Sequence, residues 1–285
     1  MRSSATALLS SLAGLSVGDS LPVRVMAVLN VSPESFYKRS VQTSRGSLAE
    51  TARAMASAGA DIIDIGAMST APYLKTHISV EAETERLAHA IEAVASQVTV
   101  PVSADTQRAQ PAAAALAAGA RIINDVSGLK HDPTMAALIA KAGAGVIVMA
   151  SEVIPGTGSP LTRIKAALED SLRIVAQAGI PHDHIVLDPG IGFFRQPGMP
   201  WDEWDCTILR ELASLRVLGF PLLVGASRKS FIGKILGQPD ATDRLLGSLV
   251  CAAIAVYNGA HIIRAHDVKE TVGAVRMAER LRPVF

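Results

Sequence analysis

The chain repeats one unit eight times: a short β-branched run, a polar loop, and an Ala/Leu-rich segment with apolar residues three and four positions apart. The β-branched runs begin at Val23, Asp61, Pro101, Arg121, Gly145, His184, Pro221 and His261. Nearly continuous apolar runs of this kind suit strands that are buried on both faces of a parallel sheet. The repeat therefore predicts an α/β protein, a single (β/α)8 TIM barrel over residues 23–285, preceded by an N-terminal extension, residues 1–22.

Glycines mark the expected ends of the helical segments. They stand where a C-cap is needed, at Gly59, Gly119, Gly143, Gly179, Gly219 and Gly259. The competing architecture is an open, doubly wound sheet, which usually has fewer strands and a G-x-G-x-x-G turn after the first of them. That turn is absent from the sequence. A length of 285 residues is ordinary for one barrel domain.

The first twenty residues contain an apolar LLSSLAGL stretch that weakly resembles a signal peptide. Ser and Gly interrupt this stretch, and Asp19 follows without a convincing cleavage pattern. We therefore expect an N-terminal helix or edge segment. No later stretch reaches the roughly 18 uncharged apolar residues that a membrane span requires, so no membrane partner is expected.

Composition narrows the choice of partners and compartment. The formal net charge is +1 and no basic run interleaves with aromatic residues, so a nucleic-acid partner is not expected. Cys206 and Cys251 lack C-x-x-C spacing and fit buried apolar positions. This pattern favours a reducing compartment, with the cytoplasm as the default.

Polar residues gather where the predicted strands end. The strand ends carry Asn30, Asp64, Asp105, Asn124, Asp125, Met149, Asp188, Lys229, Arg264 and His266. Each residue alone could serve as a helix cap or a turn former. Because the carboxyl ends of barrel strands meet at one mouth, the whole set would place several charges and amides together, which costs stability unless they bind something. We therefore expect a functional site there.

The residue types indicate what such a site could hold. Carboxylates, one amide and one cation suit a flat heterocycle with an amino-pyrimidinone edge, and they are supplied by Asp105, Asn124, Asp188 and Lys229. Arg264 and His266 alternate with Ala265, so both would share one face of the last strand and suit a phosphate oxyanion. Arg264 could instead pair with a carboxylate such as Asp267 or Glu270.

Three further signals are weaker. His182, Asp183 and His184 resemble a metal cluster on paper, but they precede a strand and would lie at the opposite end of the barrel, so we expect no metal there. Met149 could be core or could cover one face of a ring. Trp201 and Trp204 suggest a surface lid or a subunit contact.

Seven segments resemble dihydropteroate synthases. They are LNVSPESF at Leu29, GADIIDIGAMST at Gly59, PVSADT at Pro101, GARIINDVSG at Gly119, LDPGIGF at Leu187, LVGASRKSFIG at Leu223 and RAHDV at Arg264. They occur in the order of the family and cover nearly the whole chain from about residue 24 onward.

The resemblance implies a transferase that condenses 6-hydroxymethyl-7,8-dihydropterin diphosphate with an arylamine and releases diphosphate, with Mg2+ as cofactor. It implies a pterin set of Asp105, Asn124, Met149, Asp188, Gly225 and Lys229, and a diphosphate set of Asn30, Arg264 and His266. Asn30 would also help to hold Mg2+, and the catalytic set would be Lys229, Asp105, Arg264 and His266. The arylamine side would be Ser69, Thr70, Pro72 and Ser230. A homodimer is expected from the family. The apolar stretch from Leu245 to Val256 could form its interface or could equally cover the barrel.

Departures from the family pattern fall on the amine side and in the loops. Glu34 replaces Asp, Ala71 replaces Arg, Ala150 replaces His, and GIGFFR with Arg195 stands where Gly-Phe-Gly-Lys is usual. The SPESFYK loop resembles that of archaeal and methylotroph-type relatives in the methanopterin branch of the family. This resemblance implies that the amine is ribofuranosylaminobenzene 5′-phosphate, used toward tetrahydromethanopterin, in place of 4-aminobenzoate. Additional cations for its phosphate could be Lys38, Arg39, Lys75 and Arg195, which could equally be solvated loop charges.

Two other functions remain open at this stage. A pterin-dependent corrinoid methyltransferase would share the barrel and the pterin pocket but would not need the diphosphate residues of SRKS and RAHD. A non-catalytic pterin-binding protein is conceivable because the loops differ from the family pattern.

Overall fold

The computed structural model describes residues 7–32, 44–68, 78–154, 157–194 and 198–283. The strands are β1 Leu9–Leu12, β2 Leu15–Gly18, β3 Arg24–Asn30, β4 Ile62–Gly66, β5 Val102–Asp105, β6 Ile122–Asp125, β7 Gly145–Met149, β8 Ile185–Asp188, β9 Leu223–Val224 and β10 Ile262–Ala265. The α-helices are α1 Arg45–Ser57, α2 Val80–Ala95, α3 Ala109–Ala117, α4 Met135–Ala142, α5 Pro160–Ala178, α6 Trp201–Arg210, α7 Ser230–Leu236, α8 Leu245–Tyr257 and α9 Val268–Leu281.

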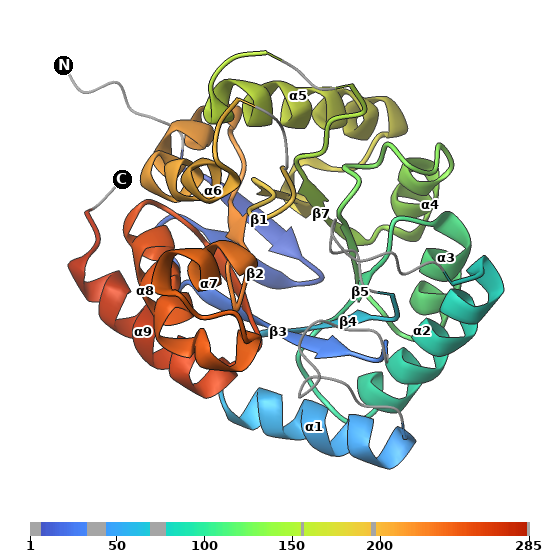
Figure 1. Ribbon diagram of the computed structural model, residues 1–285. Coiled ribbons are helices and arrows are strands. Elements are labelled where there is room, and N and C mark those ends of the chain that lie inside the picture. Colours follow the sequence, from blue (N-terminus) through green and yellow to red (C-terminus); the bar gives the residue numbers. More distant parts are fainter. Residues whose placement is uncertain (1–6, 33–43, 69–77, 155–156, 195–197, 284–285) are drawn as a thin grey trace.

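Strands β3 to β10 form one parallel barrel. Their order is β8-β7-β6-β5-β4-β3-β10-β9. A parallel bridge between Leu187 and Leu222 closes the ring, and the Leu187 N–H donates to the Pro221 carbonyl at 3.0 Å. Figure 1 shows the helices as a ring around these strands. The predicted (β/α)8 barrel is confirmed, and the six glycines expected at helix ends all have positive φ.

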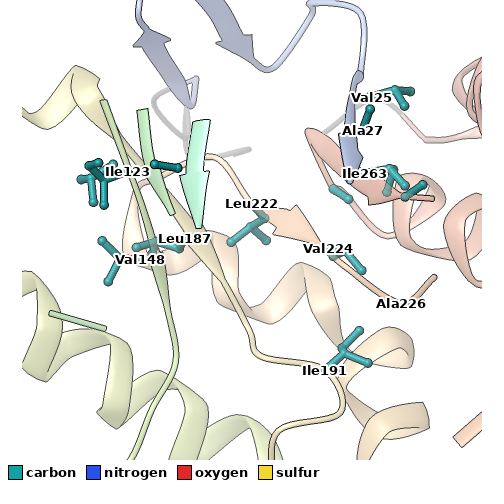
Figure 2. Close-up of a cluster of buried hydrophobic side chains, with 14 of the residues drawn as sticks. Val25, Ala27, Ile123, Val148, Leu187, Ile191, Leu222, Val224, Ala226 and Ile263 are labelled. Carbon is teal, nitrogen blue, oxygen red and sulfur yellow. The ribbon is translucent and has the colours of Figure 1, made fainter. Parts of the chain in front are cut away.

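Alternation along the strands creates two separate apolar cores. Residues that point outward pack beneath the helices, and Figure 2 shows members of this first core on β3, β6, β7, β8, β9 and β10. Residues that point inward near the amino ends of the strands form the second core: Met26, Ile62, Ile122, Ile147, Val186, Leu223 and Ile262. The lower half of the barrel interior is therefore filled and apolar.

The N-terminal extension contributes an antiparallel hairpin, β1–β2, and not the helix or edge segment that we expected. Its tight turn uses Ala13 and Gly14, whose φ values are 53° and 85°. Leu12 and Val17 are fully buried in the second core. The Ser10 hydroxyl donates to the Ile185 carbonyl at 2.7 Å. The hairpin thus plugs the amino-terminal end of the barrel, opposite the strand ends that carry the polar residues.

Replacing Leu12 with alanine is expected to lower the free energy of unfolding by about 2–5 kcal/mol, because truncating a buried leucine side chain leaves a cavity in the core. Urea denaturation would measure the change. Leu9 is the matched control, since it lies on the same strand and is 57% exposed. Leu9→Ala should change stability by less than about 0.5 kcal/mol, and equal losses in both variants would show that the hairpin does not plug the barrel.

Two expectations from the sequence concern the burial of the cysteines and the absence of a membrane span. Cys206 and Cys251 are both free, and the buried positions expected for them are only partly buried, against the hydrophobic core. Among the described residues, no helix combines the length and apolar character that crossing a bilayer requires.

Candidate active site

The carboxyl ends of the strands reverse the character of the barrel interior from apolar to polar. Register places Gly66 beside Asp105, Asp105 beside Asn124, and Met149 beside Asp188. A Cβ on Gly66 would lie 3.7 Å from Asn30 Oδ1 and 3.6 Å from Asp105 Oδ2. The missing side chain at Gly66 thus lets an amide oxygen and a carboxylate oxygen approach the same small space.

Arg264 lies at the centre of a buried charge cluster. Its Nε donates to Asp64 Oδ2 at 2.7 Å, and its Nη2 donates to Asp105 Oδ2 at 2.8 Å. Asn124 Nδ2 donates to the same Asp64 oxygen at 3.0 Å. Asp64 is fully buried, so it orients Arg264 and Asn124 together. The alternative that Arg264 pairs with a carboxylate is confirmed, but its partners are Asp64 and Asp105 and not Asp267 or Glu270. Asp64 was expected at the barrel mouth but was not assigned a role there.

Two carboxylates, Asp64 and Asp105, share this single guanidinium, and the environment shifts the protonation of Asp105. Burial raises the pKa of Asp105 to about 7, and the nearby charge of Asp64 adds to this effect while Arg264 opposes it. Burial works against the charge of Arg264, but Asp64 and Asp105 prevail and raise its pKa above the ordinary value. Arg264 is therefore always charged, while Asp105 can take up a proton near neutral pH.

Asp188 and Lys229 lie at the same mouth of the barrel as Arg264. Burial raises the pKa of Asp188, and the charges of Lys229 and Arg264 oppose that rise. Asp188 Oδ1 accepts from the Gly190 N–H at 2.8 Å. Lys229 Nζ donates to the Ile191 carbonyl and lies 4.6 Å from the centroid of the Phe193 ring. The structure thus brings a carboxylate and an ammonium group from β8 and the β9–α7 turn together with Arg264.

His266 extends the cluster along the face of β10 that also carries Arg264. Its Nδ1 lies 2.9 Å from Ser227 Oγ, which also accepts from the His266 backbone N–H at 3.2 Å. Burial lowers the pKa of His266 to about 3, and the cations Arg264, Arg228 and Lys229 reinforce the shift. The imidazole is therefore neutral at physiological pH. In the tautomer in which Nδ1 accepts from the Ser227 hydroxyl, Nε2 carries the proton and can donate it in a hydrogen bond.

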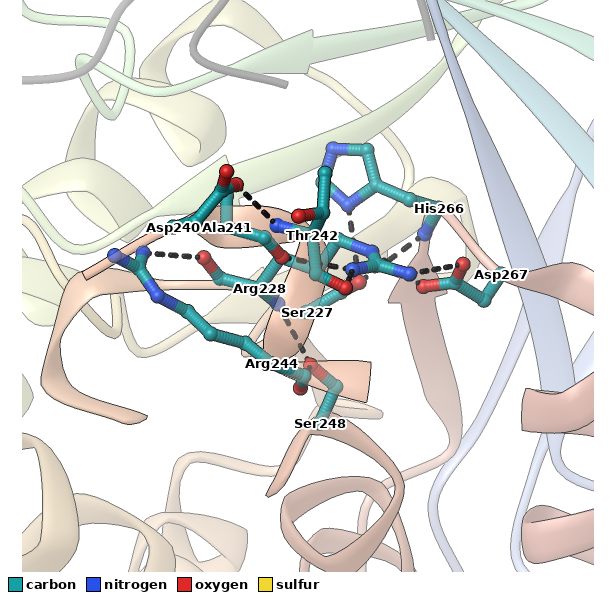
Figure 3. A network of polar contacts seen from close by, with 9 residues as sticks. All are labelled: Ser227, Arg228, Asp240, Ala241, Thr242, Arg244, Ser248, His266 and Asp267. Carbon is teal, nitrogen blue, oxygen red and sulfur yellow. Dashed lines mark hydrogen bonds and ion pairs between the residues drawn. The ribbon is translucent and has the colours of Figure 1, made fainter. Parts of the chain in front are cut away.

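Arg228 builds the turn that presents Ser227 and Lys229. Its Nε and Nη2 donate to both oxygens of Asp267 at 2.7 and 2.6 Å, and its Nη1 donates to the carbonyls of Ala241 and Thr242 at 2.7 and 2.9 Å (Figure 3). Its backbone has a φ of 57°, a strained value for this residue type. The sequence reasoning missed this support, although SRKS and RAHD, which contain both partners, were singled out.

The remaining predicted site residues have different outcomes. Ser69, Thr70 and Pro72 lie outside the described residues, as do the loop positions Glu34, Lys38, Arg39, Ala71, Lys75 and Arg195. Ser230 begins α7 directly after Lys229. A Cβ added at Gly225 would lie 3.7 Å from the Cβ of Arg264, so Gly225 lies beside Arg264. Met149 ends β7 and is only 2% exposed.

The histidine pair and Trp204, which the sequence also singled out, have separate outcomes. His182 to His184 form a 3-10 turn before β8, and His182 stacks on Phe220. No group of three or more His, Cys, Asp and Glu residues within the described ranges could hold a metal ion. Trp204 is buried against Phe194, so it is neither a surface lid nor a subunit contact.

A closed parallel barrel with buried, pKa-shifted groups at the carboxyl ends of its strands defines a (β/α)8-barrel enzyme. The family model described as pterin binding enzyme matches residues 26–266. The chain is 38% identical over 264 residues to the dihydropteroate synthase of Synechocystis sp., covering 90% of this chain and 89% of that protein.

Solved structures agree with this relationship. A Yersinia pestis dihydropteroate synthase in complex with a sulfonamide drug superposes with a TM-score of 0.86 and 34% identity, covering 96% of this chain and 98% of that one. A Xanthomonas albilineans dihydropteroate synthase with 4-aminobenzoic acid gives a TM-score of 0.85 and 31% identity, with coverage of 97% and 98%. The chain belongs to the dihydropteroate synthase family of pterin-binding enzymes, which are transferases, and the expected family is confirmed.

Proposed function

We propose that this enzyme condenses 6-hydroxymethyl-7,8-dihydropterin diphosphate with an arylamine and releases diphosphate. The observation that supports this most directly is the junction at Arg264. A carboxylate and amide cradle adjoins a pair of anion-binding donors, Arg264 and His266, at one barrel mouth. A substrate that joins a pterin to a diphosphate needs both halves of this arrangement.

The pterin half is matched by hydrogen-bond polarity. Ionised Asp188 and Asp105 would accept from the amino and ring N–H groups of the pterin, and Asn124 can both donate and accept. Lys229 would donate to the carbonyl side of the ring. All of these groups are at least partly buried, which strengthens each bond and makes a mismatched ring costly.

The diphosphate half explains how the reaction proceeds without a strong base. The bond between the exocyclic methylene carbon and the diphosphate oxygen breaks, and its electron pair leaves with the diphosphate. The pterin ring delocalises the positive charge that remains on the methylene carbon. The lone pair of the amine nitrogen then forms the new C–N bond, and the nitrogen releases a proton to solvent. Arg264 and the neutral His266 would hydrogen-bond the departing diphosphate, where negative charge develops.

Mg2+ is the expected cofactor, and Asn30 would help to hold it. Mg2+ prefers hard oxygen ligands and usually keeps water and substrate phosphates in its shell. Asn30 Oδ1 approaches the space above Gly66, next to the Arg264 cluster. When bound there, Mg2+ would neutralise charge on the leaving diphosphate. Asn30 would help to hold Mg2+ through its amide oxygen, and in this way it would help to orient the phosphate oxygens.

For the amine we propose 4-aminobenzoate. The relatives reported above are dihydropteroate synthases, and one of them was solved with 4-aminobenzoic acid. They lend no support to the phosphorylated amine that the loop departures favour, and its candidate cations lie outside the described residues. Steady-state assays with both amines would decide the question, since a higher kcat/KM for ribofuranosylaminobenzene 5′-phosphate would overturn this choice.

The reaction itself is tested by incubating the protein with pterin diphosphate, Mg2+ and amine, and measuring diphosphate release and the mass of the product. Coupled release and a C–N-linked product are expected. Pterin binding without turnover on either amine would instead identify a non-catalytic pterin-binding protein. Methyl transfer from a methylated pterin to a corrinoid would identify the methyltransferase.

We also propose a homodimer formed through α8. The inner face of this helix, with Ser248, Ala252, Ala255 and Val256, is buried against the barrel. Its outer face exposes the large apolar side chains of Leu246, Val250, Ile254 and Tyr257, so the helix is apolar all round. They line an apolar groove of about 680 Å³ between α6, α7 and α8. Sedimentation velocity should show a dimer that Val250→Glu converts to a monomer, and a monomeric native protein would refute the proposal.

Pterin binding is expected to strengthen as pH rises through about 7, because Asp105 must lose a proton, with a pKa of about 7, before it can accept from the ring. Calorimetry with a pterin that lacks diphosphate would measure this without interference from phosphate ionisation. Asp105→Asn should bind more weakly and lose the pH step. A step that persists in the variant would assign the titration to another group.

A further inference from the structure

We propose that Asp205 is a positioning residue that orients Lys229 through a single peptide group of the β8–α6 loop. This inference rests on the proposed function, in which Lys229 binds the pterin. Asp205 lies on α6, is fully buried, and has no place in the reaction described above. Its Oδ1 accepts from the Gly192 N–H at 2.7 Å.

The peptide group between Ile191 and Gly192 connects the two charges. Its N–H donates to Asp205, and its carbonyl accepts from Lys229 Nζ. Because a trans peptide is planar, its N–H and C=O point in opposite directions, so Asp205 and Lys229 bind opposite sides of one rigid plate. A carboxylate on the N–H also polarises the carbonyl and makes it a better acceptor for an ammonium group.

Gly192 brings the loop into direct contact with the stem of Lys229. A Cβ at Gly192 would lie 2.8 Å from Lys229 Cδ, and the glycine has a φ of 83°. The loop therefore touches the lysine along its methylene chain and at its ammonium group. Rotation of this peptide would remove both contacts at once and release Lys229 from its position near Asp188.

Helix α6 is a firm base for such a contact. Trp204, next to Asp205, stacks on Phe194 with ring centroids 5.2 Å apart, and the Arg163 guanidinium lies 4.7 Å over the Trp204 ring. Arg163 in turn pairs with Glu152 of the β7–α5 loop. The same helix thus holds the loop at both Gly192 and Phe194, while Asp205 itself stays buried in α6.

Calorimetry with an unreactive pterin tests the role on the intact protein. Asp205→Ala should weaken pterin binding by about ten- to a hundredfold, the range for losing a hydrogen bond to a charged group. Asp205→Asn keeps an acceptor oxygen and should recover most of the affinity. Asp202→Ala is the matched control, because Asp202 lies on the same helix and makes a surface ion pair with Lys234. The Asp202→Ala variant should bind the pterin with the affinity of the native protein.

A double-mutant cycle separates positioning from a general structural role. If Asp205 acts through Lys229, the penalty of Asp205→Ala should vanish in a Lys229→Met background. An undiminished penalty, or failure of Asp205→Asn to recover affinity, would overturn the inference. Should Asp205→Ala not fold, the cycle is run with Asp205→Asn, whose smaller penalty must vanish in the same background. Absence of pterin binding by the native protein would refute the proposed function instead.

Discussion

Methionine in place of Arg264 is expected to lower the free energy of unfolding by about 3–5 kcal/mol, the loss seen when one partner of a buried ion pair is removed. The reason is that Asp64, fully buried, and Asp105, 9% exposed, would lose the guanidinium that both of them bind. The same variant should lose about 10²–10³-fold in kcat/KM, as when a donor to a developing anion is deleted. Urea denaturation and steady-state kinetics would measure the two effects.

A second substitution separates the two effects of Arg264. Adding Asp64→Asn to Arg264→Met removes one uncompensated charge, so stability should be largely restored. Activity should remain low, because the donor to the diphosphate is still missing. Recovery of both properties together would show that Arg264 is only structural. Arg264→Lys keeps the charge but cannot bond Asp64 and Asp105 in the same forked geometry, so an intermediate loss is expected.

Replacing Lys229 with methionine is expected to reduce kcat/KM by about 10²–10³-fold, mainly through weaker pterin binding, because a buried charge-assisted contact is lost while its partner remains buried. Lys229 also opposes the burial that raises the pKa of Asp188. Without Lys229 that pKa rises further, so the carboxylate needed to accept from the pterin is formed only at higher pH. The pH dependence of the variant's affinity should therefore extend to higher pH than that of the native protein.

Lys234 provides the control for Lys229. Both lysines lie at or within α7, and both have an ammonium group over an aromatic ring, but Lys234 pairs with Asp202 at the surface. Lys234→Met should keep kcat/KM within about twofold of the native value, because exposed pairs contribute little. Calorimetric titration across the neutral pH range would compare the two variants. Equal losses would mean that the effect comes from α7 as a whole.

Much of the fold could be predicted because the strands and helices follow from the local periodicity of apolar residues. Each β-branched run and each helical segment carries its own pattern, and eight repeats admit few closed arrangements. The position of the site followed from the same logic, since parallel strands direct their carboxyl ends to one mouth. Asp188, Lys229, Arg264 and His266 could therefore be placed together before any distance was known.

The hairpin shows where this reasoning stops. Leu12 and Val17 are buried by strands that lie elsewhere in the chain, such as the one that contains Ile147. The local pattern of residues 7–18 does not indicate that these residues pack into the amino-terminal end of a barrel. The interpretation as a helix or edge segment failed for that reason, because a local pattern cannot reveal a partner that only chain closure supplies.

The sequence by itself determined the strand and helix repeat, the barrel, and the set of side chains at its mouth, because these depend on periods of two and 3.6 residues. Only the tertiary structure decided which of those charges pair. Asp64 bonds Arg264 across 200 positions of the chain, and Arg228 bonds Asp267 across 39. Pairings of this kind are selected by distances of a few ångströms between distant segments, and such distances exist only once the barrel has closed.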